Sequence, residues 1–150
     1  MDEQDLIKQR GDVIARAINV ERIMDAVISC HYFGAVKISF LTEFLYDEYC
    51  SFGLKVNIVS KISKDKSLSQ TLRRIASIRN SFAHTGLTFN EFVDKNDPTK
   101  GYKVRTPDPK KLHENMDYVS LYNEFVKLQN DAEDKLMVLF SSKGGTATPA

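Results

Sequence analysis

Three polar residues near the middle of the chain combine side chains that suit phosphate chemistry. Arg79, Asn80 and His84 occur in the segment Arg-Asn-Ser-Phe-Ala-His, which ends a basic stretch with regularly spaced apolar residues. A guanidinium group is planar and permanently charged, so it can bind two phosphate oxygens and stabilise the charge that builds up on phosphorus in a transition state. An imidazole exchanges a proton near neutral pH and can serve as a general base or acid. If the protein is an enzyme, we expect its chemistry at residues 79–84.

The apolar spacing around these residues predicts a helix that begins at Ser67 or Leu68 and ends near His84. On such a helix Asn80 and His84 share a face, so the amide can orient the imidazole or a bound ribose phosphate. Arg79 and His84 diverge by about 140 degrees at roughly 100 degrees per residue. Three arrangements would bring them together: the long reach of arginine, a helix that ends at His84, or a second copy of the site across a dimer. We favour the last two in combination.

Basic side chains are concentrated in the segment before the histidine. Residues 55–79 contain seven lysines and arginines against one acidic residue, Asp65, although the net charge of the whole chain is +1. Such a local excess suits binding to an RNA backbone better than binding to a small uncharged metabolite. The alternative is that about half of these side chains only solvate two helices. The residues that we expect to bind the substrate backbone are Lys64, Lys66, Arg73 and Arg74.

The rest of the chain predicts the helices that hold this segment. A first long helix has one apolar face, formed by Leu6, Val13, Ala17, Val20, Met24 and Val27. Gly34 is expected to break it, and residues 36–50 then predict a second helix whose large side chains belong to the core. Residues 54–62 predict a shorter helix, and residues 110–140 predict a final long one.

The pattern changes between the histidine and the last helix. Gly86 is expected to cap the preceding helix, and residues 87–105 predict a β-hairpin with a long turn, which Pro107 and Pro109 end. Residues 141–150 contain no large apolar side chain and are expected to fray as a flexible tail. The predicted fold class is all-α, an antiparallel bundle of about four to five helices, with the small β-hairpin inserted before the last helix. We expect one domain at residues 1–140.

Composition and chain length exclude several other classes. A chain of 150 residues that is 42% hydrophobic and 27% charged suits one soluble globular domain, not a disordered or fibrous protein. Cys30 and Cys50 form no CxxC pair and have no histidine at zinc-ligand spacing, so no metal, cofactor or disulfide framework is expected. The N-terminus is acidic where a signal peptide is basic, and no apolar run reaches the roughly 20 residues that span a bilayer. We expect a protein of the reducing cytoplasm without membrane contact.

Residues 78–84, Ile-Arg-Asn-Ser-Phe-Ala-His, resemble the Arg-x4-6-His signature of the HEPN superfamily (higher eukaryotes and prokaryotes nucleotide-binding). The polar residue after the arginine, here Asn80, is typical of this signature. The seven-residue sequence as a whole is typical of bacterial members. The predicted helix order is similar too, so the resemblance covers most of the chain. It implies an all-α domain that dimerises with two motifs facing one another and that in many members is a metal-independent endoribonuclease.

For this chain the resemblance implies a role for each motif residue. His84 would activate the ribose 2′-hydroxyl for attack on the adjacent phosphate, Arg79 would stabilise the negatively charged phosphorus, and Asn80 would help to position it. The product would be a 2′,3′-cyclic phosphate. Some relatives carry an acidic residue that supports the site from across the bundle, which Glu21 or Asp25 could supply, whereas the alternative is that this pair belongs to a solvated helix face. The implied partners are a homodimer, RNA and a protein antitoxin or operon partner, because such proteins often act as toxins or in phage defence.

A noncatalytic function stays open beside the nuclease. The chain is also similar to the mannitol operon repressor group, in helix order and in the His-Thr-Gly at 84–86 that precedes an extended aromatic segment. That likeness implies a regulator or protein-interaction module without cleavage. A hydrolase that uses Cys30 or Cys50 is a weaker third alternative, because neither cysteine has a basic partner nearby in the sequence.

Overall fold

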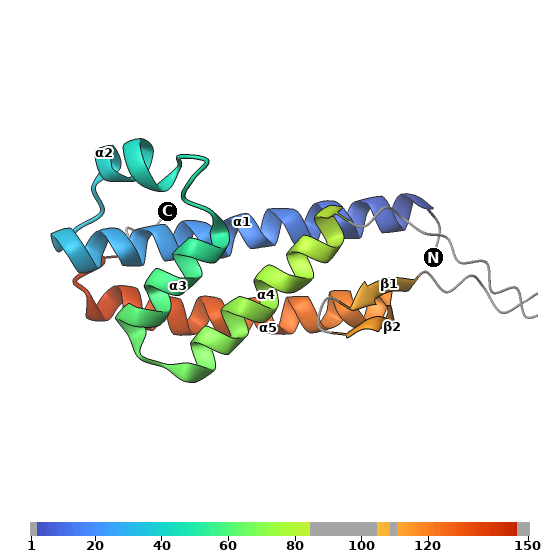
Figure 1. The fold of residues 1–150 in the computed structure, drawn as a ribbon. Helices are drawn as coiled ribbons and strands as arrows, with labels where there is room; N and C mark the ends of the chain where they lie inside the picture. The colour runs from blue at the N-terminus through green and yellow to red at the C-terminus, as the bar shows by residue number, and fades with distance from the viewer. Residues whose placement is uncertain (1–2, 85–104, 109–110, 147–150) are drawn as a thin grey trace, which may run out of the picture.

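The protein folds as a helical bundle, which we describe from a computed structural model at residues 3–84, 105–108 and 111–146. Figure 1 shows two long helices, α1 and α5, lying along the molecule, with α4 crossing them and a short arch at the far end of α1. The bundle confirms the helical class that the sequence predicts. The elements in chain order are α1 (Glu3–Phe33), α2 (Ile38–Phe40), the π-helical turn η1 (Leu41–Leu45), α3 (Phe52–Ser63), α4 (Lys66–His84), β1 (Arg105–Asp108), β2 (Lys111–Asp117) and α5 (Tyr118–Ser142).

The two longest helices, α1 and α5, run in the same direction. Tyr122 donates a hydrogen bond to Asp12 with an O–O distance of 2.6 Å, and Arg16, further along α1, donates at 2.8 Å to Gln129, which is also further along α5. Contacts that advance together along both chains mark a parallel pair, and α1 and α5 follow the same course in Figure 1. The predicted antiparallel arrangement is therefore wrong for this pair.

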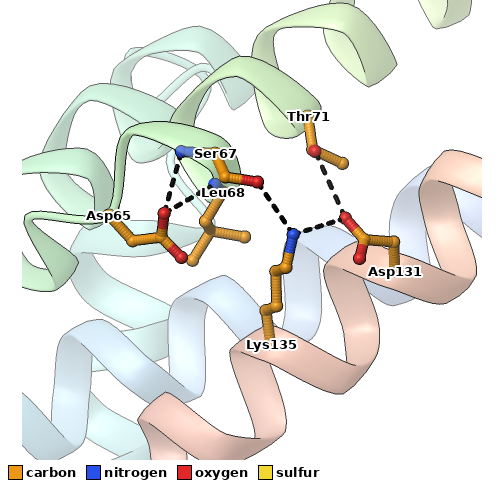
Figure 2. A network of polar contacts seen from close by, with 6 residues as sticks. All are labelled: Asp65, Ser67, Leu68, Thr71, Asp131 and Lys135. Atoms are coloured by element: carbon orange, nitrogen blue, oxygen red, sulfur yellow. Dashed lines mark hydrogen bonds and ion pairs between the residues drawn. The ribbon is translucent and has the colours of Figure 1, made fainter.

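Helix α4 runs against α5, as the polar contacts of its first turns show (Figure 2). The Lys135 ammonium donates to the Ser67 hydroxyl at 3.0 Å, whereas Thr71, one turn later in α4, donates to Asp131 at 3.3 Å, one turn earlier in α5. At the helix start, the Asp65 carboxylate accepts from the backbone N–H of Ser67 at 2.8 Å. This cap satisfies a donor that the first helical turn would otherwise leave free. The start of α4 is thus both capped and tied to α5.

The core is built from the apolar faces that the sequence predicts for the long helices. On α1 the face from Val13 to Val27 is buried. On α4 the apolar residues at spacings of three and four are buried as well, namely Leu68, Leu72, Ile75, Ile78 and Phe82. Both confirm the helical periodicity. Helix α5 completes the core from the other side. The largest fully buried side chains include Met24, Ile28, Leu68, Leu72, Ile75, Ile78, Leu121, Phe125 and Leu136.

Residues 36–50 do not form the predicted second helix of the core. They form α2 and η1, an arch that stands off α1 on the side away from α5 (Figure 1). Leu41 and Leu45 are buried beneath the arch, but Phe44 is 62% exposed and Tyr49 is 84% exposed. The prediction that these large side chains belong to the core is confirmed for Leu41 and Leu45 but wrong for Phe44 and Tyr49, because no described element covers the outer face of the arch.

The last helix begins later than predicted. Residues 111–117, expected to be helical, form β2 and pair antiparallel with β1, with Arg105 opposite Asp117. Leu112 and Met116 fit the apolar spacing of a helix, but pairing with β1 gives the backbone of this segment another set of hydrogen-bond partners. The predicted hairpin at 87–105 lies, apart from Arg105, outside the described residues, as does the predicted cap Gly86.

The end of α5 also differs from its predicted boundary. The helix continues through Ser142, and the Gly145 N–H then donates to the Phe140 carbonyl at 3.0 Å. Gly144 has φ 86° in this turn, a left-handed conformation that glycine adopts at little cost. The predicted tail boundary at residue 141 is therefore wrong for the first residues of the tail, which form the end of α5 and a turn through Gly145.

Candidate functional site

The structure places the Arg79–His84 motif on the last two turns of α4. Arg79 is partly exposed, Asn80 is exposed, and the Arg79 guanidinium donates to the Asn80 side-chain oxygen at 3.1 Å. Among the described residues no carboxylate forms an ion pair with Arg79. Its charge is therefore not neutralised within this part of the fold, and an anion can approach it.

Helix α4 stays helical through His84, its last residue. The two positions 79 and 84 therefore keep the separation of about 140 degrees that a regular helix gives them. One chain does not bring Arg79 and His84 onto one helix face. Among the predicted arrangements, a dimer would bring the Arg79 of one chain close to the His84 of another, and this stays a prediction.

Arg10 of α1 reaches the same end of α4, and sequence reasoning missed it. Its Nη2 atom donates to the Ala83 carbonyl oxygen at 2.8 Å. The last carbonyls of a helix lack intrahelical donors and carry the negative end of the helix dipole, so a guanidinium stabilises them. Arg10 and Ala83 are 73 positions apart in sequence, so no local pattern indicates this contact. Arg10 adds a second cation beside the motif.

Aromatic packing fixes this end of α4 against the start of α5. The rings of Phe82 and Tyr118 lie 4.6 Å apart between centroids, and both residues are buried. Burial raises the pKa of the Tyr118 hydroxyl to about 12, against a smaller lowering by the positive charge of Arg10. Tyr118 therefore stays protonated at neutral pH and acts here as a packing residue.

The predicted substrate-binding residues divide into two groups. Arg74 is buried against α5, where Nε and Nη2 donate to the two oxygens of Glu124 at 2.6 and 2.9 Å. Its assignment to substrate binding is corrected, because the guanidinium is buried and two of its nitrogens already donate to Glu124. Lys64, Lys66 and Arg73 are exposed and line a depression of about 290 Å³ at the connection between α3 and α4.

That depression lies at the opposite end of α4 from the motif. At about 1.5 Å of rise per residue, Lys66 and His84 are separated by roughly 27 Å along the helix. Lys64 and Lys66 are therefore too far away to contact the phosphate that Arg79 would bind. Arg73 lies closer, about 9 Å before Arg79 along the helix.

Glu21 and Asp25 do not form a solvated face, and they do not reach the motif. Lys55 of α3 places its ammonium 2.7 Å from Glu21 Oε1 and 3.2 Å from Asp25 Oδ2, and both Lys55 and Asp25 are 2% exposed. Glu21 lies eleven positions after Arg10, about 16 Å further along α1. The acidic pair thus holds a buried lysine that the sequence grouped with the basic stretch. Their predicted supporting role at the motif is not what the described contacts show.

Burial perturbs the ionisation of this cluster. Desolvation, with a smaller contribution from the charge of Glu21, raises the pKa of Asp25 to about 6, against the hydrogen bond and charge of Lys55, which lower it. Burial alone would lower the pKa of Lys55, but hydrogen bonds to Glu21 and Asp25 outweigh it, so this pKa is raised. Two carboxylates share one ammonium. Asp25 is the more deeply buried acid, and its charge is not fully compensated. Its Oδ1 atom accepts no hydrogen bond, although Lys55 Nζ lies 3.0 Å away.

The raised pKa of Asp25 predicts a pH-dependent stability. Between its ordinary pKa of 3.8 and its folded pKa of about 6, the folded state holds a proton that the unfolded state has released, so the stability of the protein falls as pH rises. Asp25→Asn removes this term. We expect the free energy of unfolding of the variant, relative to the wild type, to rise by on the order of 2–3 kcal/mol between about pH 4 and pH 7 in urea titrations. A pH-independent difference would contradict the buried, uncompensated carboxylate.

The remaining groups offer little for other chemistry. Cys30 is buried and Cys50 partly buried, and burial raises the pKa of both thiols, which disfavours the thiolate that a cysteine hydrolase needs. In residues 3–84, 105–108 and 111–146, no group of three or more histidine, cysteine or acidic side chains is placed to hold a metal ion. None of the helices described here combines the length and apolarity needed to cross a membrane.

The chain was compared with protein-family models, with curated proteins and with solved structures, and none of them matches it.

Proposed function

We propose that the protein is a metal-independent endoribonuclease of the HEPN type, with the end of α4 as its half-site. The observation that carries the proposal is the contrast between two arginines of one helix. The Arg74 guanidinium forms a bidentate ion pair with Glu124, whereas Arg79 contacts only the neutral amide of Asn80 among the described residues. An arginine kept partly exposed, next to a helix end that already carries Arg10, suits an anionic substrate.

In the proposed reaction RNA is cleaved by its own 2′-hydroxyl. His84 takes the proton from this hydroxyl, the 2′-oxygen attacks the adjacent phosphorus, and the bond from phosphorus to the 5′-oxygen breaks. Arg79 stabilises the negative charge on the phosphoryl oxygens as the bonds change, and Asn80 orients the guanidinium through their hydrogen bond. The 5′-oxygen receives a proton and leaves, and the other product ends in a 2′,3′-cyclic phosphate.

A symmetric dimer completes this site. The reaction needs both a base and an acid, and the motif of one chain contains one histidine. In a twofold dimer the same surface of both chains meets itself, so two copies of the α4 end would form one cleft with two histidines and two arginines. This arrangement also supplies an Arg79 close to a His84, which the regular helix of one chain does not.

Cleavage in the presence of EDTA tests the proposal. Purified protein is expected to cut a mixed RNA substrate without added metal and to leave 2′,3′-cyclic phosphate ends, identified by their resistance to phosphatase until acid opens the ring. Arg79→Lys keeps the charge but loses the planar fork, so we expect cleavage about tenfold slower. Arg22→Lys, at an exposed position of α1, is the matched control. Absence of cleavage by protein free of any bound inhibitor protein would rule the nuclease out.

A noncatalytic regulator or interaction module is the second candidate, in line with the likeness to the mannitol operon repressor group. It is favoured by the aromatic side chains that the arch leaves exposed, among them Phe44 and Tyr49. This function predicts a partner whose binding survives both Arg79→Ala and His84→Ala. Loss of the biological effect through those two substitutions alone would contradict it. An antitoxin or operon partner fits either candidate.

A further inference from the structure

The end of α1 and the arch that follows it carry a group of exposed apolar side chains, some of which are joined by ring contacts. Rings contact one another from α1 across α2 to η1, with centroid distances of 4.9 Å between Phe33 and Phe40 and 5.7 Å between Phe40 and Phe44. Contiguous exposed apolar surface of this kind marks interaction sites, whereas single exposed apolar residues are ordinary. We name this surface the aromatic ledge; its exposed residues are Tyr32, Phe33, Ile38, Phe44, Tyr46 and Tyr49, each between 44% and 84% exposed.

The ledge is held in shape without a partner. The buried hydroxyl of Ser29 donates to the Ala35 carbonyl at 3.0 Å and accepts from the Lys37 N–H at 2.8 Å, which fixes the connection from α1 to the arch. Leu41 and Leu45 anchor the inner side of η1 in the core. A surface that is already ordered loses little conformational entropy when it binds. The exposed rings are therefore presented by a fixed backbone.

A cavity adjoins the ledge at its later end. It has a volume of about 330 Å³ and lies between η1, α1 and α3. Tyr46 and Asp47 line it on the side of the arch, and its charged residues on the side of the bundle are Glu21, Arg22, Asp25 and Lys55. The buried Lys55 ammonium is already bound by Glu21 and Asp25, so it does not attract an anion. A pocket of this size next to an apolar surface suits one anchoring side chain of a partner.

The charge around the ledge selects the kind of partner. Residues 31–50 contain three acidic side chains, Glu43, Asp47 and Glu48, all exposed, and one lysine, Lys37. That ammonium lies over the ring of Phe33, 4.7 Å from its centroid. Acidic groups disfavour RNA on this face, and two ledges facing each other would repel. Basic side chains of a partner would form ion pairs with the carboxylates and cation–π contacts with the faces of the exposed rings.

We propose that the aromatic ledge and its adjoining cavity bind a segment of another protein that carries apolar and basic side chains together. The apolar side chains of the segment pack on the rings of Phe44 and Tyr49, and its lysines or arginines pair with Glu43, Asp47 and Glu48. The ledge lies on the far part of α1 from Arg10 and the end of α4, so binding there does not depend on the proposed nuclease site.

Selection from a phage-displayed library of random 16-residue peptides tests this proposal. The library is selected on the immobilised full chain and counter-selected on Phe44→Ser/Tyr49→Ser. Enriched peptides are expected to combine large apolar residues with lysine or arginine. A labelled synthetic peptide of the enriched sequence is expected to bind the wild type at least about tenfold more tightly than the double variant in fluorescence anisotropy. Both replaced residues are exposed, and unchanged circular dichroism and urea midpoint verify the fold.

Two further variants test whether peptide binding depends on the acidic residues around the ledge or on nonspecific apolar contact. Glu43→Lys/Glu48→Lys is expected to weaken the peptide at least about tenfold through like-charge repulsion. Val138→Ser removes an apolar side chain that is 72% exposed on α5, away from the ledge, and is expected to bind the peptide as the wild type does. RNA cleavage by the ledge variants is expected to equal that of the wild type, which separates this result from that of the nuclease test.

Several outcomes would overturn the proposal. These are a selection that enriches no peptide, peptides that lack basic residues, or peptides that bind the wild type and Phe44→Ser/Tyr49→Ser alike. Sedimentation that shows a dimer lost in this double variant would make a second copy of the chain the occupant instead. Binding of a labelled single-stranded RNA that the same variant loses would make RNA the occupant.

Discussion

His84→Gln is expected to lower the single-turnover rate of RNA cleavage by on the order of 10²–10⁴-fold, because glutamine keeps a hydrogen-bonding group of similar size but cannot exchange a proton at neutral pH. The rate is measured on an end-labelled RNA in EDTA, with protein in excess. The substitution lies at the last residue of α4, where a helix end tolerates glutamine. Unfolding curves of the variant and the wild type should therefore nearly coincide.

His31→Gln is the matched control for this prediction. His31 is exposed near the end of α1, and its ring contacts Tyr32 edge to face, with a centroid distance of 4.9 Å. It lies far from the end of α4, so the same chemical change there should leave the cleavage rate unaltered. Equal cleavage by wild type and His84→Gln would mean either that another residue acts as base or that a contaminating nuclease cuts the RNA.

Mixing the inactive chain with the wild type tests whether the site is shared between chains. If one cleft needs the histidines of both chains, random pairing at equal concentrations should reduce the activity per wild-type chain to about one half. Independent sites would leave this activity unchanged. The mixture must be incubated long enough for chains to exchange. An unchanged rate after verified exchange would contradict the dimeric site but not the role of His84 itself.

Lys55→Met is expected to lower the free energy of unfolding by about 3–5 kcal/mol at pH 7.5, because it leaves Asp25 charged and buried without a cation. Lys55 and Asp25 are each 2% exposed, so little solvent screens the Asp25 charge once the ammonium is lost. Urea denaturation followed by circular dichroism measures the change. The loss should be smaller at about pH 5, where Asp25 is protonated in the folded state.

Two companion variants separate the orphaned charge from lost packing. Lys61→Met lies on the same helix at an exposed position and should change the stability by no more than about 0.5 kcal/mol. Lys55→Met/Asp25→Asn removes both charges of the buried pair and should recover much of the loss. A double variant as unstable as Lys55→Met alone would mean that the stem of the lysine, not its charge, stabilises this region.

The sequence predicts the long helices well because their signal is local. Apolar residues at spacings of three and four identify one face of α1, α3 and α4 without knowledge of any neighbour. The same reasoning fails for residues 36–50, where apolar side chains are abundant but the arch has one covered side. Phe44 and Leu45 are adjacent in sequence and equally apolar, yet the first is 62% exposed and the second 3% exposed. Composition does not tell which face a distant element will cover.

The candidate site shows the same division. The sequence predicts that Arg79 and His84 lie on one helix, and the structure places both on α4. It does not distinguish Arg73 from Arg74, which are neighbours of identical chemistry. Arg73 is exposed, whereas Arg74 is buried in a bidentate ion pair with Glu124, fifty positions later. The partner decides which arginine is free to bind a substrate.

By itself, the sequence determined the helical class, the position of α4 and the residue types at its end, because backbone periodicity and side-chain chemistry act within a few turns. The tertiary structure alone decided that α1 and α5 run parallel, that Arg10 meets the carbonyl of Ala83, and that Lys55 is buried between Glu21 and Asp25. Each of these contacts joins residues at least thirty positions apart. Such pairs form because packing brings whole helix faces together, and no local pattern records which charged groups will then meet.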